Sequence, residues 1–338
     1  MVVALAATLV AAVTVAVAVG PLAIPAGTVW RIIAHHVTGL PREVSWTDMQ
    51  DTVVWQLRLP RALLAALVGA GLAVVGVATQ ALVRNPLADP YLLGISSGAA
   101  TGAVLVIITG LSVFGAPSAA AAAFAGALLT FMVVYWLGSR GGSMAPLRLV
   151  LTGVAVGYAL YGIAHYLLTQ ADNPGQTNSV LFWLLGSLGK AQWAQLGLPA
   201  AVLAAGVLLL AGQARAMNAL LVGDETAASL GIDVERVRRI LFALTSLVTG
   251  VMVSLTGAIG FVGLVVPHAV RLLVGSDHRR VLPVAVFGGG AFVVLIDVVA
   301  RLALAPAELP IGVVTAVVGA PVFLWLLNRR GGLGGVEL

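Results

Sequence analysis

Long apolar stretches follow one another along almost the whole chain and are separated by short polar connections. A transmembrane helix needs about 20 mainly apolar residues, and continuous apolar stretches favour helices over the alternating strands of a β-barrel. The pattern predicts an all-α polytopic membrane protein with about ten transmembrane helices, in one domain over residues 1–338. We expect these helices at about 2–20, 61–83, 92–110, 118–138, 147–169, 196–214, 239–257, 260–275, 283–304 and 311–327.

Three of the polar connections carry further predictions. Gly27–Gly39 has apolar residues along one helical face, which predicts a short helix at the membrane surface. Residues 169–179 are hydrophilic and are expected to form a loop. The stretch Phe182–Trp193 is too short to span a membrane and is interrupted by glycine, so we expect a re-entrant or interfacial turn.

The longest polar connection is Leu221–Ile240, in a protein with only 9% charged residues. Asp224 is suited to cap a helix start, Glu225 to lie in its first turn, and Gly231 to follow its end. Asp233 is placed to begin a second short helix. Two short capped helices between apolar spans indicate a docking surface for a water-soluble partner, whereas the alternative is a connector that is merely polar.

Composition agrees with a membrane protein, because 60% of the residues are hydrophobic and the mean hydropathy is +1.06. The chain has no cysteine, which excludes disulfides and thiolate metal sites. Its net charge of +5 comes mainly from arginines scattered through the loops and does not indicate nucleic-acid binding. The apolar N-terminal run has no basic segment before it and no clear cleavage site, so we expect a retained first span.

The basic residues predict the topology. Twelve of them, Arg140 and Arg329 among them, fall in one set of loops, and six fall in the other. Cytoplasmic loops carry the excess of arginine and lysine, so we expect both termini and Leu221–Ile240 to face the cytoplasm.

The sequence offers few residues that could carry chemistry. It contains no catalytic motif, metal-ligand cluster or phosphate-binding loop, so we expect no enzymatic activity, and any ATP must bind to another chain. Asp297 and Arg301 are four apart in a predicted span, a spacing that allows an ion pair, with either a packing or a relay role. Tyr158, Tyr161 and His165 share one helical face, which suits either a ligand passage or helix packing.

Three arginines, Arg58, Arg61 and Arg301, are predicted on the outer side of the membrane, against the general bias. Two interpretations are open for them. Their side chains extend to the membrane surface without a specific partner, or they dock an acidic protein.

Five motifs, in order over residues 55–328, resemble the permease subunits of ABC importers for ferric siderophores, heme and cobalamin, the FecCD type. They are LRLPRALLAALVGAGLAVVG from residue 57, NPLADP with LGISSG in 85–98, Gly223–Gly231, GAIGFVGLVVPHAVRLLVGSDHRRVLP in 257–283 and AELPIGVVTAVVGAPVFLWLL in 307–327.

The resemblance implies a homodimeric type II ABC importer in a bacterial inner membrane. Two cytosolic ATPase subunits would hold ATP and magnesium, and no cofactor would bind this chain. The coupling helices, at about 221–240, would contact the ATPase through Gly223, Asp224, Glu225, Ala227, Ala228, Leu230 and Gly231. A second permease copy, the lipid bilayer and an extracytoplasmic binding protein would be the other partners, the last docking on Arg58, Arg61 and Arg301.

The resemblance also implies a cytoplasmic gate at Asn85 and Leu87, with a second element at Ala145 and Pro146. The best-known cobalamin member has small hydroxyl residues at this second element, so this chain departs from that pattern. Tyr158, Tyr161 and His165 would line the pathway. Ferric siderophore is the first expected substrate, with heme and cobalamin as alternatives, and an ion-coupled secondary transporter is the rival function.

Overall fold

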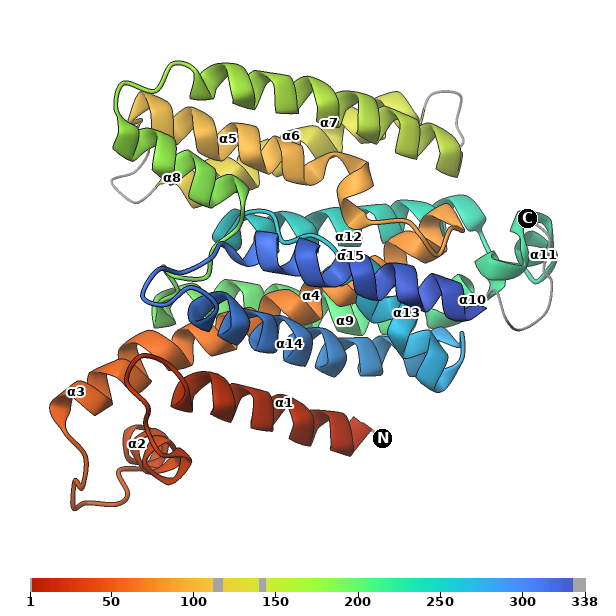
Figure 1. Cartoon of the computed structure of the whole chain (residues 1–338). Coiled ribbons are helices and arrows are strands. Elements are labelled where there is room, and N and C mark those ends of the chain that lie inside the picture. Colours follow the sequence, from red (N-terminus) through yellow and green to blue (C-terminus); the bar gives the residue numbers. More distant parts are fainter. Residues whose placement is uncertain (1, 112–117, 140–143, 331–338) are drawn as a thin grey trace.

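The computed structural model describes residues 2–111, 118–139 and 144–330, and the described chain is almost entirely helical (Figure 1). Arg140, which entered the topology count, lies outside these residues. Every predicted span corresponds to one helix, which confirms the all-α prediction. These helices are α1 (Val2–Ala18), α4 (Leu59–Val83), α5 (Ile95–Thr109), α6 (Ser118–Gly138), α7 (Pro146–Leu168), α9 (Gly197–Gly212), α12 (Val234–Thr256), α13 (Val262–Val274), α14 (His278–Leu302) and α15 (Ile311–Arg330).

The ten helices differ in length. Six of them are long and apolar enough to cross a membrane, and α1, α5, α13 and α15 are shorter apolar helices. The helix containing α4 is longer than predicted, because α3 (Asp48–Asp51) and the π-helical segment η1 (Thr52–Arg58) continue directly into it. Thr47 and Gln50 begin this long helix with a reciprocal capping box.

The short helices confirm one prediction and correct another. The helix expected at 27–39 is present as α2 (Ala26–Thr38), and its place at the membrane surface stays a prediction. The loop expected at 169–179 is wrong from residue 174 onward, because α8 (Pro174–Leu184) begins there. Asn173 caps this helix by accepting the Gln176 N–H at 3.0 Å, and Pro174 takes the first helical position. After α8 the chain is irregular to Gln192, and η3 (Trp193–Gln195) leads into α9.

Helix α4 lies at the centre of the fold and buries 20 of its 25 residues. It packs against α12, α13 and α14, while α5–α8 form a second group on one side and α1–α3 lie on the other (Figure 1). A helix that is apolar on every face is expected to be surrounded in this way. Its glycines allow close approach, as where Gly69 meets Gly289 of α14.

The two ends of the helix bundle carry different residues. In Figure 1, the start of α1, the end of α15 and the short helix α11 (Asp224–Ser229) lie at the same end, as an even number of spans requires. We call this the island end. The opposite end carries Arg58, Arg61 and Arg301 and is called the arginine end.

Candidate functional site

The polar stretch 221–240 is helical, but its pieces differ from the prediction. Gly231 follows α11 with a φ of +78°, and the Asp233 carboxylate accepts the Arg236 N–H at 2.9 Å, which confirms both boundary signals. Asp224 does not cap α11, because Gly223 occupies the cap position and the Asp224 side chain binds arginines instead.

The helix begun by Asp233 is not short. It is α12, which runs without interruption to Thr256. No glycine or proline separates the charged residues from the apolar residues after Arg239, so the helix continues into the span. A further short helix, α10 (Ala214–Val222), precedes the stretch and was not predicted.

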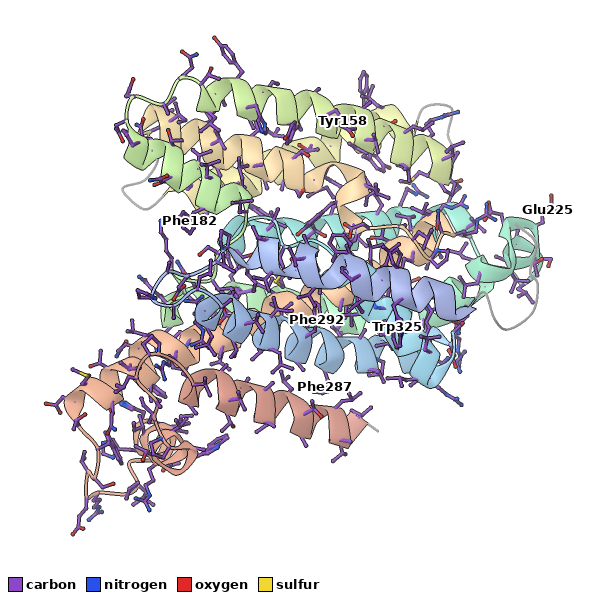
Figure 2. The ribbon with its side chains drawn as sticks, in the orientation of Figure 1. Tyr158, Phe182, Glu225, Phe287, Phe292 and Trp325 are labelled. Atoms are coloured by element: carbon purple, nitrogen blue, oxygen red, sulfur yellow. The ribbon has the colours of Figure 1, made fainter. Side chains whose placement is uncertain are left out.

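The residues assigned to ATPase coupling form an exposed surface at the island end. Within α11 only Ala227 is buried, and Leu230 is 67% exposed. Val222 is also exposed, and Figure 2 shows Glu225 far from the helical core. Exposed apolar side chains beside acidic ones, away from the apolar helices, have the composition of a protein contact surface. We call Val222–Gly231 the island surface.

The predicted gate residues lie at the same end as the island surface. Asn85 lies in the loop after α4 and stabilises a turn there, because its side-chain oxygen accepts the Leu87 N–H at 2.8 Å. Ala145 precedes α7 as its N-cap, and Pro146 is its first residue. One ion pair and one hydrogen bond join these loops to residues 224–238. Arg84 lies 3.4 Å from Asp224, and the backbone N–H of Met144 donates to the Glu235 carboxylate at 2.9 Å.

The loop after α4, which contains Asn85 and Leu87 and is called the first gate loop, also contains an acidic residue with a raised pKa, Asp89. The Asp89 carboxylate accepts the Tyr91 N–H at 2.8 Å, while burial raises the pKa of Asp89 to about 6. The neutral form is therefore favoured relative to a carboxyl in water. Among the described residues, no group of three or more histidine, aspartate and glutamate side chains could hold a metal ion.

The three residues predicted to line a pathway share one face of α7. Tyr158, labelled in Figure 2, and Tyr161 are exposed. The His165 ring lies 3.9 Å from the Tyr161 ring, centroid to centroid. The His165 Nδ1 atom also lies 3.0 Å from the Tyr161 carbonyl oxygen. A pathway, a partner helix or lipid could each cover this face, so the pathway role stays a prediction.

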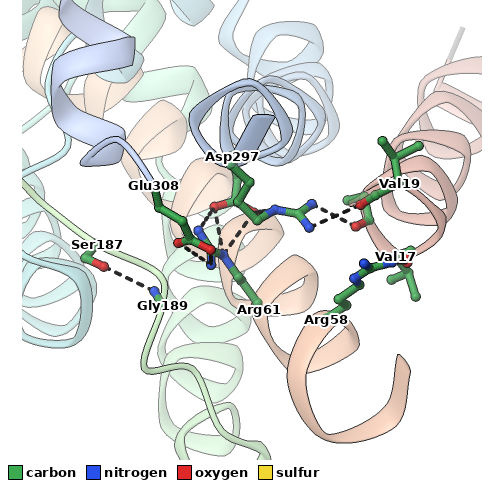
Figure 3. A network of polar contacts seen from close by, with 10 residues as sticks. Val17, Val19, Arg58, Arg61, Ser187, Gly189, Asp297 and Glu308 are labelled. Carbon is green, nitrogen blue, oxygen red and sulfur yellow. Dashed lines mark hydrogen bonds and ion pairs between the residues drawn. The ribbon is translucent and has the colours of Figure 1, made fainter. Parts of the chain in front are cut away.

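The arginine end contains the predicted ion pair and a partner that sequence reasoning missed. Arg301 Nε donates to Asp297 at 3.1 Å, which confirms the pair (Figure 3). Arg61 also binds Asp297, from Nε at 3.0 Å, and places its NH1 group 2.8 Å from Glu308. Arg61 and Asp297 are 236 residues apart, so local spacing gave no signal of this contact.

Two arginines assigned to docking are used inside the protein. Arg58 donates to the carbonyl oxygens of Val17 at 2.9 Å and Leu22 at 2.7 Å, and Arg301 donates to Ala16 at 2.7 Å. Both arginines are only 8% exposed. The last carbonyl groups of a helix have no hydrogen-bond partner within the helix and carry partial negative charge. The guanidinium groups of Arg58 and Arg301 supply the missing hydrogen bonds at the end of α1.

The expected arrangement of three outward-facing arginines is therefore incorrect for Arg58 and Arg301. The accessible part of the cluster is Arg61 with Glu308, which is the more exposed of the two. The docking role itself stays a prediction.

Comparison with known proteins identifies the family. The model of the FecCD transport family matches residues 8–329. The chain is 44% identical to the cobalamin import system permease protein BtuC of Halobacterium salinarum, over 86% of this chain and 77% of that protein. It is 41% identical to the hemin transport system permease protein HmuU of Yersinia pestis, over 84% of this chain and 87% of that one.

A solved structure agrees with these matches. It is described as an inward-facing conformation of an ABC transporter of the metal-chelate type. Its TM-score is 0.84 at 29% identity, and the likeness covers 97% of this chain and 98% of the other. The helix arrangement, the family match and the two relatives agree over nearly the whole length, and the chain belongs to the FecCD transport family.

Proposed function

We propose that this chain is the transmembrane permease subunit of an ATP-driven importer that takes up a metal chelate. The observation that carries the proposal is the likeness to a metal-chelate type ABC transporter over 97% of the chain. The chain resembles permease proteins of import systems over similar lengths. ATP hydrolysis would belong to a separate cytosolic subunit.

The island surface is the proposed seat of the ATPase. It projects from the apolar helices and exposes Leu230 and Glu225. Two copies of the chain would each contact one ATPase, which would hold ATP and magnesium. The exposed face of α7, with Tyr158 and Tyr161, would face the pathway between the copies.

The arginine end is the proposed side for an extracytoplasmic binding protein, which agrees with the cytoplasmic placement of the termini from the arginine count. Arg61 would be the arginine nearest an acidic partner, although its side chain is only 13% exposed and already pairs with Asp297 and Glu308. Arg58 and Arg301 would support this site by fixing α1 and Asp297 and would not contact the partner directly.

For the substrate we propose a metal tetrapyrrole. Sequence reasoning ranked ferric siderophore first, but only on the breadth of that branch of the family. The two relatives are named for cobalamin and hemin, which are both tetrapyrroles, and this supports that class over siderophores.

Uptake in proteoliposomes tests the function. The chain, its co-purifying ATPase and a binding protein loaded with cobalamin or hemin should give uptake that requires ATP. This uptake should continue when ionophores dissipate the ion gradients. Uptake that needs an ion gradient and no ATP would support the secondary transporter instead. A ferric siderophore imported in preference to both tetrapyrroles would overturn the substrate proposal alone.

The seat of the ATPase has its own test. Leu230→Asp with Gly231→Pro should abolish ATPase co-purification, because the first change places a charge in the exposed apolar contact and the second disrupts a turn with positive φ. Gly212→Ala, at the end of α9 where an added Cβ meets nothing within 4 Å, is the control. Normal co-purification of the double variant would place the ATPase elsewhere.

A further inference from the structure

A buried arginine at the island end is shared unequally by two carboxylates. Arg238 of α12 is only 4% exposed. Its NH2 group donates to both oxygens of Asp224, at 2.8 and 2.9 Å, whereas Glu235 lies 3.9 Å from its NH1 group. Asp224 is therefore its main counter-charge, and Glu235 is near but not engaged by a hydrogen bond.

Glu235 is engaged elsewhere. Its Oε2 atom accepts the N–H of Met144, a buried residue directly before the N-cap of α7. The same carboxylate therefore holds the start of α7 and lies within reach of Arg238. A small rotation of the Glu235 side chain would exchange one partner for the other.

Asp224 is the member of the group that lies on the island surface, in a short helix with one buried residue. It is the first residue of α11, and Ala227 is the one buried residue of that helix. Glycines with positive φ, Gly223 and Gly231, flank α11, so the backbone turns sharply on both sides. Arg84, next to the first gate loop, holds Asp224 from the other side at 3.4 Å. A force on the island surface would reach Asp224 before any buried residue.

We propose that Asp224 and Glu235 form a carboxylate exchange that transmits movement of α11 to the start of α7. While Asp224 holds Arg238, Glu235 retains the Met144 N–H. When α11 moves and Asp224 withdraws, Arg238 is left as a buried cation and draws Glu235 to itself, because a buried charge without a partner is strongly unfavourable. Met144 then loses its acceptor, and the start of α7 is no longer held by α12.

The exchange rests on the proposed function only for the source of the movement, which would be the ATPase on the island surface. The contacts themselves belong to this chain, so they can be tested without any partner. Asp224 and Glu235 act through other groups and are positioning residues.

Amide hydrogen exchange of the full chain in lipid nanodiscs, resolved to Met144 by fragmentation, tests the proposal. Asp224→Asn imitates withdrawal and should speed exchange at Met144 by about tenfold or more. Glu235→Gln should leave it slow, because the glutamine oxygen accepts the N–H but carries no charge for Arg238. The double variant should be as slow as Glu235→Gln alone.

This pattern separates the exchange from general loosening. If the double variant exchanges as fast as Asp224→Asn, or if Asp224→Asn leaves Met144 unchanged, the proposal is wrong. Asp233→Asn is the matched control, since it removes a charge two residues from Glu235 but keeps the N-cap, and should change nothing at Met144.

A second readout uses the assembled transporter. Glu235→Gln should retain ATP hydrolysis but lower the substrate imported per ATP by about tenfold, since movement of α11 would no longer reach α7. Coupling equal to that of the unaltered chain would overturn the exchange. If the unaltered chain shows no ATP-dependent uptake, the proposed function fails, and the hydrogen-exchange result still decides the contact mechanism.

Discussion

The central contact between α4 and α14 has no room for a single methyl group. A Cβ added to Gly69 would lie 2.8 Å from the Cβ of Val293 and closer still to the carbonyl oxygen of Gly289. A Cβ added to Gly289 would lie 2.5 Å from that of Ala73. Both positions are buried, and both clashes involve backbone or short, branched side chains. Alanine at either position is therefore predicted to force the helices apart.

The cost can be worked from these distances. Carbon atoms in contact ordinarily lie about 3.5–4.0 Å apart, so the Gly69→Ala clash with Val293 requires a separation of about 0.7 to 1.2 Å. Overpacking a buried site typically costs about 1–3 kcal/mol. Val293 has a stiff rotamer and the carbonyl of Gly289 is part of α14, so neither can move away alone. For either substitution we expect the free energy of unfolding to fall by about 3 kcal/mol, the upper end of this range.

Thermal unfolding of the purified chain in detergent measures the effect. At roughly 2 °C per kcal/mol for a chain of this size, Gly69→Ala should lower the Tm by about 6 °C. Gly162→Ala in α7 and Gly212→Ala in α9 are controls, because a Cβ at either position meets nothing within 4 Å. Their Tm should stay within about 1 °C or rise. If the Tm of Gly69→Ala equals that of the controls, the helices do not approach each other as closely as described.

Three further predictions follow from single groups. Arg58→Met removes hydrogen bonds from the end of α1, so amide exchange in residues 17–22 should rise about tenfold or more while α9 stays unchanged; equal rates would refute the capping role. Because the pKa of Asp89 is raised to about 6, its contribution to stability is greatest below about pH 4 and is lost as the pH rises through 6. Asp89→Asn should therefore gain stability over the unaltered chain as the pH rises from about 4 to 6, by about 1 kcal/mol because Asp89 is partly exposed, and should keep that gain at higher pH. A gap independent of pH across this range in thermal unfolding would contradict this. Glu308→Gln removes one of the two carboxylates paired with Arg61 and should tighten association with an acidic binding protein several-fold in low salt, as measured by surface plasmon resonance. Arg61→Glu should weaken it, and an unchanged Kd in both variants would remove this pair from the docking site.

The spans and several helix boundaries could be predicted because their signals are local. A run of apolar residues long enough to cross a bilayer identifies a helix whatever surrounds it. Asp233 marks the start of a helix because its side-chain oxygen can accept a backbone N–H, and Gly231 marks the end of a helix because glycine adopts positive φ. Both residues have these roles in the structure. Asn173-Pro174 carries an equally local signal of a helix start, but the polar residues that follow it favour a loop.

The uses of the arginines could not be predicted, because the partners lie far away in the chain. Arg58 follows an outer polar segment, and its sequence context is the same whether it reaches a membrane surface, an acidic protein or another helix. Its acceptors are carbonyl oxygens 36 to 41 residues earlier. Carbonyl groups occur at every position, so the sequence contains no pattern that identifies which ones are left unbonded.

The polar stretch 221–240 shows why charge alone does not locate a contact surface. Asp224, Asp233, Glu235 and Arg238 bind groups of this chain, so much of its charge is used inside the island end. The side chains left most exposed include the apolar Leu230. Partner binding and transmission should therefore depend on different residues. Leu230→Asp should release the ATPase without altering amide exchange at Met144, and Glu235→Gln, which lies outside the island surface, should lower coupling while the ATPase remains bound.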